Sequence, residues 1–316
     1  MSPRAALRRL SDRVFGTRFE RMLAKAAADP RPDIVFGWNR GLGDIALGLQ
    51  PLFLRIRRVK PQARIVVVTR GELREGFLLT EADEVLAVED LARGAPLDVR
   101  AVARARGLDL ARAAAVFEDP DPDRWIRRHR REWTARLHWR AEFDARAERF
   151  RDELKDASFV GVHLSSETAQ FYGYAKDWPL AHWERLFTLL SAREPVRFIV
   201  FGHRPEPPLA RPDVVDLRGR TGVLEMLAVI RSHCKVLIAP DSGVLSLVYY
   251  LDAPRALTLI SLWSDPDQGV LKQGVASPNP LLVHRPLTGR NGNVANITPE
   301  EVFQAVMSSP AERRAA

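Results

Sequence analysis

The chain has 316 residues, 46% of them hydrophobic, and carries 48 Lys and Arg against 40 Asp and Glu, for a formal charge of +8. This length suffices for two domains of roughly 150 residues. A single cysteine, Cys234, excludes an intramolecular disulfide and fits a reducing cytoplasm, and no apolar run reaches the roughly 20 residues of a membrane-spanning helix. The basic charge favours anionic partners, although an arginine-rich surface without a special role explains it equally well.

Residues 4–26 predict a basic amphipathic helix, because apolar side chains recur at steps of three and four among arginines. Two uses of such a helix remain open. Its basic side favours an anionic membrane surface. Packing on its own domain is the more frequent use of an apolar stripe.

Strands and helices then alternate. Short apolar runs at 34–38, 63–69 and 84–88 predict strands, with helical periodicity after residue 44 and around 73–79. Residues 99–117 are helical or mixed, 119–123 (DPDPD) form a polar turn, and 124–156 predict a long charged helical connection. The D-x-D spelled by residues 119–121 lies in this proline-broken turn and is therefore interpreted as a solvated loop instead of a metal site.

The alternation restarts in the second half. Strands are expected at 159–164, 196–201, 235–239 and 256–260, and helices at 180–193, 223–232, 243–251 and 299–307. Thr298 and Glu301 form a predicted capping box for the last helix. The pattern predicts two doubly wound, Rossmann-like α/β domains, residues 1–150 and 151–316.

The first strand is followed by Gly41, Leu42, Gly43 and Asp44. In an open parallel sheet this turn lies at the carboxyl edge, where ligands bind, and its glycines permit close approach of backbone to a ligand. Asp44 is a candidate functional carboxylate, or else only a helix cap. With Ala46 the turn also fits a loose dinucleotide fingerprint, but the second strand ends at Arg70 without an acid for a ribose.

Two loops of the second half suit phosphate. Asp241, Ser242 and Gly243 follow a buried strand and open an apolar helix, whose N-terminal N–H groups favour an anion. Ser165 and Ser166 follow the strand at 159–164, and Lys176 supplies a compact cation further on. Taken singly, each loop is explained as well or better by capping or by an ordinary surface position.

Taken together, the segments GLGDIALGLQPLFLRIRRVKPQARIVVV, VGVHLSS, AKDWPLAHWERL, DLRGRTGVLEMLAVIRSHCKVLIAPDSGVLSL and SLWSDPD resemble glycosyltransferase family 9, the ADP-heptose:lipopolysaccharide heptosyltransferases. The resemblance covers about residues 33–305, and its most specific part is D-L-x-G-x-T through D-S-G at 216–243. Pro240 and Ser246 depart from the family's pattern.

This resemblance implies a GT-B architecture, with two Rossmann-like domains facing each other across a cleft, the first binding the acceptor and the second a nucleotide sugar. It implies an inverting transferase of the lipopolysaccharide pathway that needs neither metal nor other cofactor, with Asp44 as general base. Phosphate and donor contacts fall on the side chains and backbone of Ser165, Ser166, Lys176, Asp241, Ser242 and Gly243. Nucleotide contacts fall on Gly202, Glu206, Thr221 and Gly222.

The expected partners are a nucleotide-sugar donor, with ADP-heptose first, and a saccharide or lipid-linked acceptor, in the cytoplasm or peripherally on the cytoplasmic face of the inner membrane. Three alternatives remain: a transferase of the same fold with another donor, a noncatalytic nucleotide-sugar-binding protein, and a nucleic-acid-binding protein supported only by the basic charge. No nucleic acid partner is expected, because no known nucleic-acid motif is present.

Overall fold

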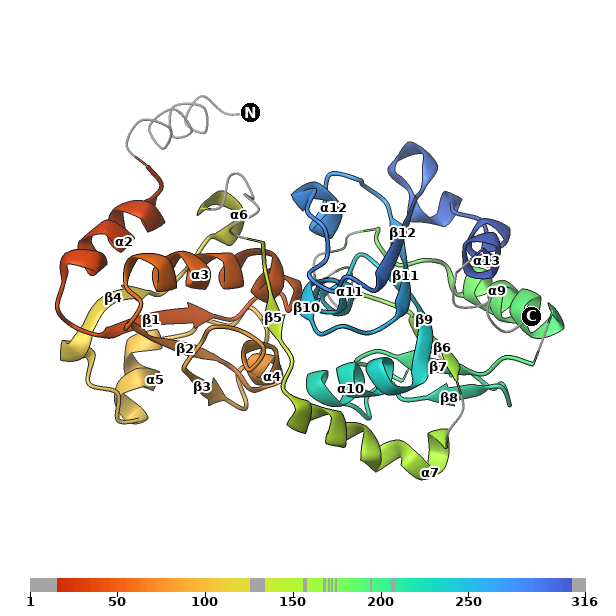
Figure 1. Ribbon diagram of the computed structural model, residues 1–316, viewed down its shortest axis with the longest axis horizontal. Helices are drawn as coiled ribbons and strands as arrows, with labels where there is room; N and C mark the ends of the chain where they lie inside the picture. The colour runs from red at the N-terminus through yellow and green to blue at the C-terminus, as the bar shows by residue number, and fades with distance from the viewer. Residues whose placement is uncertain are drawn as a thin grey trace. The chain divides into compact units, whose positions relative to one another are not determined.

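The computed structural model describes residues 16–125, 134–155, 158–166, 169, 171, 173, 175–193, 195–205 and 208–308 (Figure 1). The chain divides into two compact units, the first ending at Ala135 and the second beginning at Arg136. Each unit contains its own parallel sheet.

The first unit is built on four parallel strands in the order β3-β2-β1-β4. These strands are β1 (Asp33–Trp38), β2 (Arg64–Arg70), β3 (Glu84–Val88) and β4 (Ala113–Phe117). β1 is buried along its whole length, as expected of a strand covered on both faces. β4 lies in the segment expected to be helical or mixed. Its Ala-Ala-Ala-Val-Phe sequence has helical propensity, and pairing with β1 overrides it.

Helices cover both faces of this sheet (Figure 1). On one face α2 (Arg18–Ala28) and α3 (Gln50–Val59) pack on Ile34, Phe36, Ile65 and Val67. On the other, α5 (Val99–Ala105) packs on Val35, Val66 and Val68. Shorter elements complete the unit: the π-helix η1 (Ile45–Leu49), the 3₁₀ turns η2 (Gly71–Leu73) and η3 (Leu110–Arg112), and the helices α4 (Arg74–Phe77) and α6 (Pro122–Trp125).

The helix expected over residues 4–26 is corrected in part. Gly16 has φ +72° and Thr17 is an extended N-cap whose side chain accepts the N–H of Glu20, so α2 begins at Arg18. Residues 4–15 of the expected helix lie outside the described residues. The apolar stripe of α2, with Phe19 and Leu23, is buried in the core of the first unit.

The second unit contains six parallel strands in the order β12-β11-β9-β6-β7-β8. They are β6 (Phe159–His163), β7 (Phe198–Phe201), β8 (Val214–Asp216), β9 (Cys234–Pro240), β11 (Leu257–Trp263) and β12 (Leu282–Thr288). β8 and β12 were not expected from the sequence, since β8 has three residues and β12 is a half-exposed edge strand. The main helices are α9 (Leu180–Arg193), α10 (Val223–His233), α11 (Gly243–Tyr250), α12 (Gly269–Gln273) and α13 (Pro299–Met307).

α13 carries the predicted capping box of Thr298 and Glu301. Its Val302 and Val306 pack with Leu186 and Leu190 of α9 on the core of the second unit. Two short 3₁₀ turns precede it, η6 (Arg290–Gly292) and η7 (Val294–Asn296).

The long helical connection expected over 124–156 is wrong. In its described part, β5 (Leu137–His138) pairs in parallel with β10 (Leu251–Asp252), and a 3₁₀ helix, η5 (Ala141–Phe150), leads into α7 (Arg151–Leu154). Phe143, Ala147 and Phe150 of η5 are buried, and Arg149 of η5 forms an ion pair with Glu225 of α10. These contacts place residues 136–150 in the second unit, so the expected division after residue 150 moves to 135.

Candidate active site

Each sheet has one point where the strand order reverses. In the first unit the chain runs outward through β1, β2 and β3 and returns to the other side of β1 as β4. In the second it runs outward through β6, β7 and β8 and returns beside β6 as β9. Open parallel sheets bind ligands at the carboxyl ends of the strands beside such a reversal. Asp44 follows β1, whereas Ser165, Ser166 and Asp241 follow β6 and β9.

Asp44 does not cap a helix with its side chain. Its backbone is already helical, with φ −67° and ψ −19°, and its carboxylate makes no capping hydrogen bond at the start of η1. The carboxylate instead lies over Gly41, where an added β-carbon would come within 2.7 Å of Asp44 Oδ2 and 4.0 Å of Arg93 Nη2. The capping interpretation of the Asp44 side chain is therefore not supported, and Gly41 provides space for the carboxylate.

Hydrogen bonds of two buried polar side chains, Asn39 and Arg70, hold the loop that carries Asp44. The Asn39 side-chain amide donates to the carbonyls of Ala92 and Ala95, both at 2.9 Å. Arg70, only 2% exposed, donates through Nη1 to the Arg40 carbonyl at 2.8 Å. Arg70 thus supports the loop from within the protein, which argues against the weak dinucleotide interpretation that would turn it toward a 2′-phosphate.

The D-x-D turn has a partner of opposite charge. Asp119 Oδ1 accepts a hydrogen bond from Arg40 Nη2 at 2.6 Å at the carboxyl end of β4. Among the described residues, no group of three or more His, Cys, Asp and Glu side chains is arranged to hold a metal ion.

In the second unit, Lys176 and Asp241 form an ion pair. Lys176 Nζ lies 2.5 Å from Asp241 Oδ2, and the two side chains are only 15% and 10% exposed. The Asp241 N–H donates to the Leu262 carbonyl at 3.1 Å, which fixes its backbone beside β11. The sequence predicted both residues for donor binding, and the fold brings them together across 65 positions of the chain.

Ser242 and Gly243 begin α11. The Ser242 hydroxyl is the N-cap and accepts the Leu245 N–H at 3.3 Å, and Ser246 donates its hydroxyl to the Ser242 carbonyl at 3.2 Å. Ser246, one of the departures from the family pattern, is 1% exposed, and its hydroxyl satisfies a carbonyl of the first turn of α11. The helix N-terminus remains an electropositive point beside Asp241.

The two serines after β6 have different surroundings. Ser165 is half-buried, whereas Ser166 is 1% exposed and its N–H donates to Asp177 Oδ1 at 2.6 Å. Burial raises the pKa of the Asp177 carboxyl, and the hydrogen bond from Ser166 acts in the opposite direction. The Ser166 N–H is therefore engaged within the protein, and Ser165 is the more accessible of the two predicted phosphate ligands.

The predicted nucleotide residues cluster at the carboxyl ends of β7 and β8. Gly219, at φ +69°, donates its N–H to the Gly202 carbonyl at 2.9 Å, which joins the loop after β7 to the loop after β8. Thr221 and Gly222 lead into α10, and the Gly222 N–H donates to Glu225 Oε2 at 3.0 Å. Glu206 lies outside the described residues.

A cavity of about 450 Å³ opens beside the Lys176–Asp241 pair. Residues from the loops after β11 and β12 form its wall, with Lys176 at one side. Sequence reasoning missed its polar groups, Asp265, Gln268 and Thr288. A signal was present, because Asp265 and Gln268 lie in the polar D-P-D-Q-G turn directly after a buried strand.

His163, the last residue of β6, is also close to this edge of the sheet. It is 6% exposed, its Nδ1 is buried without a hydrogen-bond partner, and burial lowers its pKa to about 4. The imidazole is therefore neutral at pH 7.

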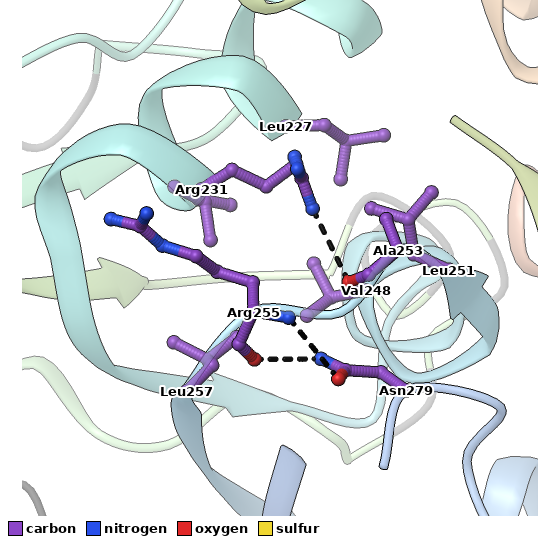
Figure 2. Close-up of a pocket in the computed structure, with 9 residues that line it drawn as sticks. Leu227, Arg231, Val248, Leu251, Ala253, Arg255, Leu257 and Asn279 are labelled. Atoms are coloured by element: carbon purple, nitrogen blue, oxygen red, sulfur yellow. Dashed lines mark hydrogen bonds between the residues drawn. The ribbon is translucent and has the colours of Figure 1, made fainter. Parts of the chain in front are cut away.

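A second cavity is too small for a substrate. It has a volume of about 20 Å³, enough for roughly one water, and lies among residues of α10, α11 and β11 (Figure 2). Figure 2 shows Arg231 donating to the Ala253 carbonyl, and Asn279 exchanging hydrogen bonds with the backbone of Arg255. These contacts brace the segment between α11 and β11.

No helix of the described residues combines the length and the apolar character needed to span a membrane.

No protein-family model matches the sequence, and no curated protein matches it in sequence. Solved structures do match in fold. The glycosyltransferase of family 9 from Veillonella parvula matches with a TM-score of 0.61 at 15% identity, over 88% of this chain and 96% of that one. ADP-heptose lipopolysaccharide heptosyltransferase II of E. coli matches with a TM-score of 0.60 at 16% identity, over 90% of this chain and 100% of that one.

The E. coli heptosyltransferase WaaC, in a structure with ADP, matches with a TM-score of 0.54 at 15% identity, over 87% of this chain and 98% of that one. These similarities extend through both units of the chain. The protein has the GT-B fold of these glycosyltransferases, built from two Rossmann-like units.

Proposed function

We propose that the protein is an inverting glycosyltransferase that transfers a heptose from ADP-heptose to a saccharide or lipid-linked acceptor without a metal ion. The observation that carries the proposal is the Lys176–Asp241 pair beside a 450 Å³ cavity at the strand-order reversal of the second sheet. The shared fold supports it, since the matched proteins include an ADP-heptose heptosyltransferase and a heptosyltransferase with bound ADP.

In this proposal Asp44 is the general base. It accepts the proton of the acceptor hydroxyl as that oxygen attacks the anomeric carbon of the donor sugar, and the bond from that carbon to the diphosphate breaks. Its position supports this role, because the carboxylate lies in a glycine turn at the carboxyl edge of the first sheet and makes no capping bond.

The second unit holds the donor and stabilises the departing diphosphate. Lys176, the N-terminus of α11 and the Ser165 hydroxyl provide positive charge and donors where negative charge develops. The Lys176 ammonium is paired with the Asp241 carboxylate, so a diphosphate that binds at Lys176 contacts an ammonium that already has a carboxylate partner.

The proposal is tested by incubating the protein with a panel of nucleotide sugars, with and without lipid-linked and saccharide acceptors, and measuring nucleotide release. Acceptor-dependent release of ADP from ADP-heptose, above that from UDP- and GDP-sugars, is the expected result. Acceptor-dependent nucleotide release from a different nucleotide sugar alone would support sugar transfer but reject ADP-heptose as the donor. Tight binding without any release would identify a noncatalytic nucleotide-sugar-binding protein.

The proposal includes reversible attachment to the cytoplasmic face of the inner membrane through the arginine-rich N-terminal segment, where a lipid-linked acceptor would be met. Each basic residue near an anionic surface contributes on the order of 1 kcal/mol. Because Phe19 and Leu23 belong to the core of the first unit, a truncation must stop before α2. Deleting residues 1–15 should weaken binding to phosphatidylglycerol vesicles, and unchanged binding would reject the attachment.

A further inference from the structure

Two hydrogen bonds connect Trp263, Ser261 and His284 in the second unit, and the proposed mechanism uses none of these residues. Trp263 Nε1 donates to Ser261 Oγ at 2.6 Å, and Ser261 Oγ lies 2.7 Å from His284 Nε2. Ser261 and Trp263 are two residues apart on β11, so their side chains lie on the same face of this strand, and both are fully buried. His284 belongs to the neighbouring edge strand, β12.

The chemistry of the three groups fixes the direction of both bonds. An indole N–H only donates, so the Ser261 hydroxyl oxygen accepts from Trp263. Burial lowers the pKa of His284 to about 4, so at pH 7 its imidazole is neutral and carries one proton. If that proton were on Nε2, the hydroxyl hydrogen of Ser261 would have no acceptor among the described residues. The proton of His284 is therefore assigned to Nδ1, and Nε2 accepts from Ser261.

The six-membered ring of Trp263 lies next to the residues proposed for donor binding. Gly269 separates this ring from Asp241, because a β-carbon at position 269 would come within 2.7 Å of Trp263 Cη2 and 2.9 Å of Asp241 Oδ1. The other oxygen of the same carboxylate, Oδ2, pairs with Lys176 Nζ at 2.5 Å. A rotation of the indole would therefore move Gly269 and displace the Asp241 carboxylate.

His284 is held in turn by the helix that begins beside Asp241. Its ring packs edge-on against the Tyr249 ring, with centroids 5.0 Å apart and planes inclined at 70°. Tyr249 is fixed at its hydroxyl, which donates to the Val275 carbonyl at 2.8 Å, and it belongs to α11. The acceptor of the Ser261 hydroxyl thus has a defined position.

We infer that Ser261 and His284 are positioning residues for the donor site. Their hydrogen bonds fix the rotation of Trp263, and Trp263 fixes, through Gly269, the Asp241 carboxylate that pairs with Lys176. This inference rests on the proposed function, which assigns that pair to the diphosphate of the donor. It goes beyond it by naming two residues that act on the donor site through Trp263.

The hydrogen bonds are tested by ¹⁵N NMR of the full chain at pH 7. The indole signal of Trp263, identified as the one missing from Trp263→Phe, should shift in Ser261→Ala because its acceptor is removed. The ring nitrogens of His284, identified by their loss in His284→Leu, should show the neutral tautomer with the proton on Nδ1. A proton on Nε2, or an identical indole signal in Ser261→Ala and wild type, would overturn the inference.

The positioning role is tested by isothermal titration calorimetry with ADP as the probe. Ser261→Ala and His284→Leu each remove one hydrogen bond that orients Trp263, so Kd for ADP should rise about fivefold in both. His284→Gln should stay within about twofold of wild type, because its Oε1 accepts from the Ser261 hydroxyl. Val283→Ala is the matched control: its exposed side chain lies on the other face of β12, and Kd should not change.

Wild-type Kd values in both Ser261→Ala and His284→Leu would mean that the two hydrogen bonds serve only the core, and would overturn the inference. Failure of the proposed function gives a different result, since the wild-type protein then releases no nucleotide in the panel, whereas the NMR signals involve no donor. If the panel shows release of another nucleotide, that nucleotide replaces ADP as the probe. A wild-type protein that binds no nucleotide would overturn both.

Discussion

Two glycines of the candidate site face carboxylates that a methyl group would displace. A β-carbon on Gly41 would lie 2.7 Å from Asp44 Oδ2, and one on Gly269 would lie 2.9 Å from Asp241 Oδ1. Both separations are shorter than normal contacts of carbon with oxygen. Because these two positions have no side chain, the carboxylates of Asp44, the proposed base, and of Asp241, the partner of Lys176, can occupy their observed positions.

The substitution Asp44→Asn tests the proposed base. Asn retains the size of Asp but does not accept the proton of the acceptor hydroxyl, so kcat should fall by about 10²–10⁴-fold. Kd for the nucleotide sugar should change little, since the proposed donor ligands belong to the second unit. Steady-state kinetics and donor titration measure the two quantities. Near-wild-type turnover in a folded Asp44→Asn protein would remove Asp44 from the mechanism.

The substitution Gly269→Ala tests the placement of Asp241. Besides Asp241, the new methyl group would meet the buried Trp263 ring at 2.7 and 2.8 Å, so Asp241 and its partner Lys176 should shift and KM for the donor should rise about tenfold. Gly274→Ala is the matched control: its φ of +61° is close to the +50° of Gly269, but no atom lies within 4 Å of the added carbon. Both variants should lose about 1 kcal/mol of stability through the backbone, and only Gly269→Ala should raise KM. Equal KM in the two would contradict the prediction.

At the scale of elements, the packing of α2 limits which part of the basic N-terminal stretch can contact a membrane. Thr17 and Glu20 cap the helix reciprocally, and Arg55 of α3 pairs with Glu20 at 3.0 Å. Phe19, Leu23 and Ala26, which form the apolar stripe of α2, are buried in the core of the first unit. This stripe is therefore not available to insert into a membrane. The exposed residues of α2 are the basic Arg18, Arg21 and Lys25 and the small Ala24, Ala27 and Ala28.

Phe19→Ala measures this packing. Phe19 is fully buried, stacks on Trp125 with ring centroids 5.8 Å apart, and lies 5.6 Å from the ring of Phe117. Removing the ring should lower the free energy of unfolding by about 3–5 kcal/mol, measured by urea denaturation. The exposed Lys25→Ala on the same helix should stay within about 0.5 kcal/mol of wild type. Equal stability of Phe19→Ala and wild type would mean that α2 does not belong to the core.

At the scale of the whole molecule, a buried histidine makes stability depend on pH. Burial lowers the pKa of His163 from 6.5 to about 4. Between these values the unfolded chain binds a proton that the folded protein does not, so the free energy of unfolding falls as pH decreases from 6.5 to 4. Burial also lowers the pKa of His284 to about 4, so His284 changes the free energy of unfolding in the same direction.

His163→Leu should reduce this dependence. At pH 5 the unfolded chain is mostly protonated at this position, and the contribution of His163 to the loss of stability between pH 7 and 5 is about 2 kcal/mol. Urea denaturation of the full chain at the two pH values measures it, and the comparison of slopes holds even if Leu changes the stability at pH 7. An identical loss in the variant and in wild type would show that His163 does not titrate in this way.

Local patterns in the sequence determined the central strands and long helices of this protein. Continuous apolar runs predicted β1, β2, β6 and β9 to within one or two residues at each end, because these strands are buried on both faces. The helix over 180–193 and the capping box of Thr298 followed in the same way from periodicity and cap chemistry. Parallel alternation then predicted that Asp44, Ser165 and Asp241 follow strands at carboxyl edges.

Only the tertiary structure decided the rest. β4, β8 and β12 exist as strands because a neighbouring strand pairs with them, and their own residues do not demand it. The approach of Lys176 to Asp241, 65 positions apart, the burial of Ser166, and the cavity formed by Asp265 and Gln268 all depend on loops from different strands that converge at one sheet edge. Such contacts are set by the strand order, which depends on packing between distant segments, and no local pattern of residues encodes it.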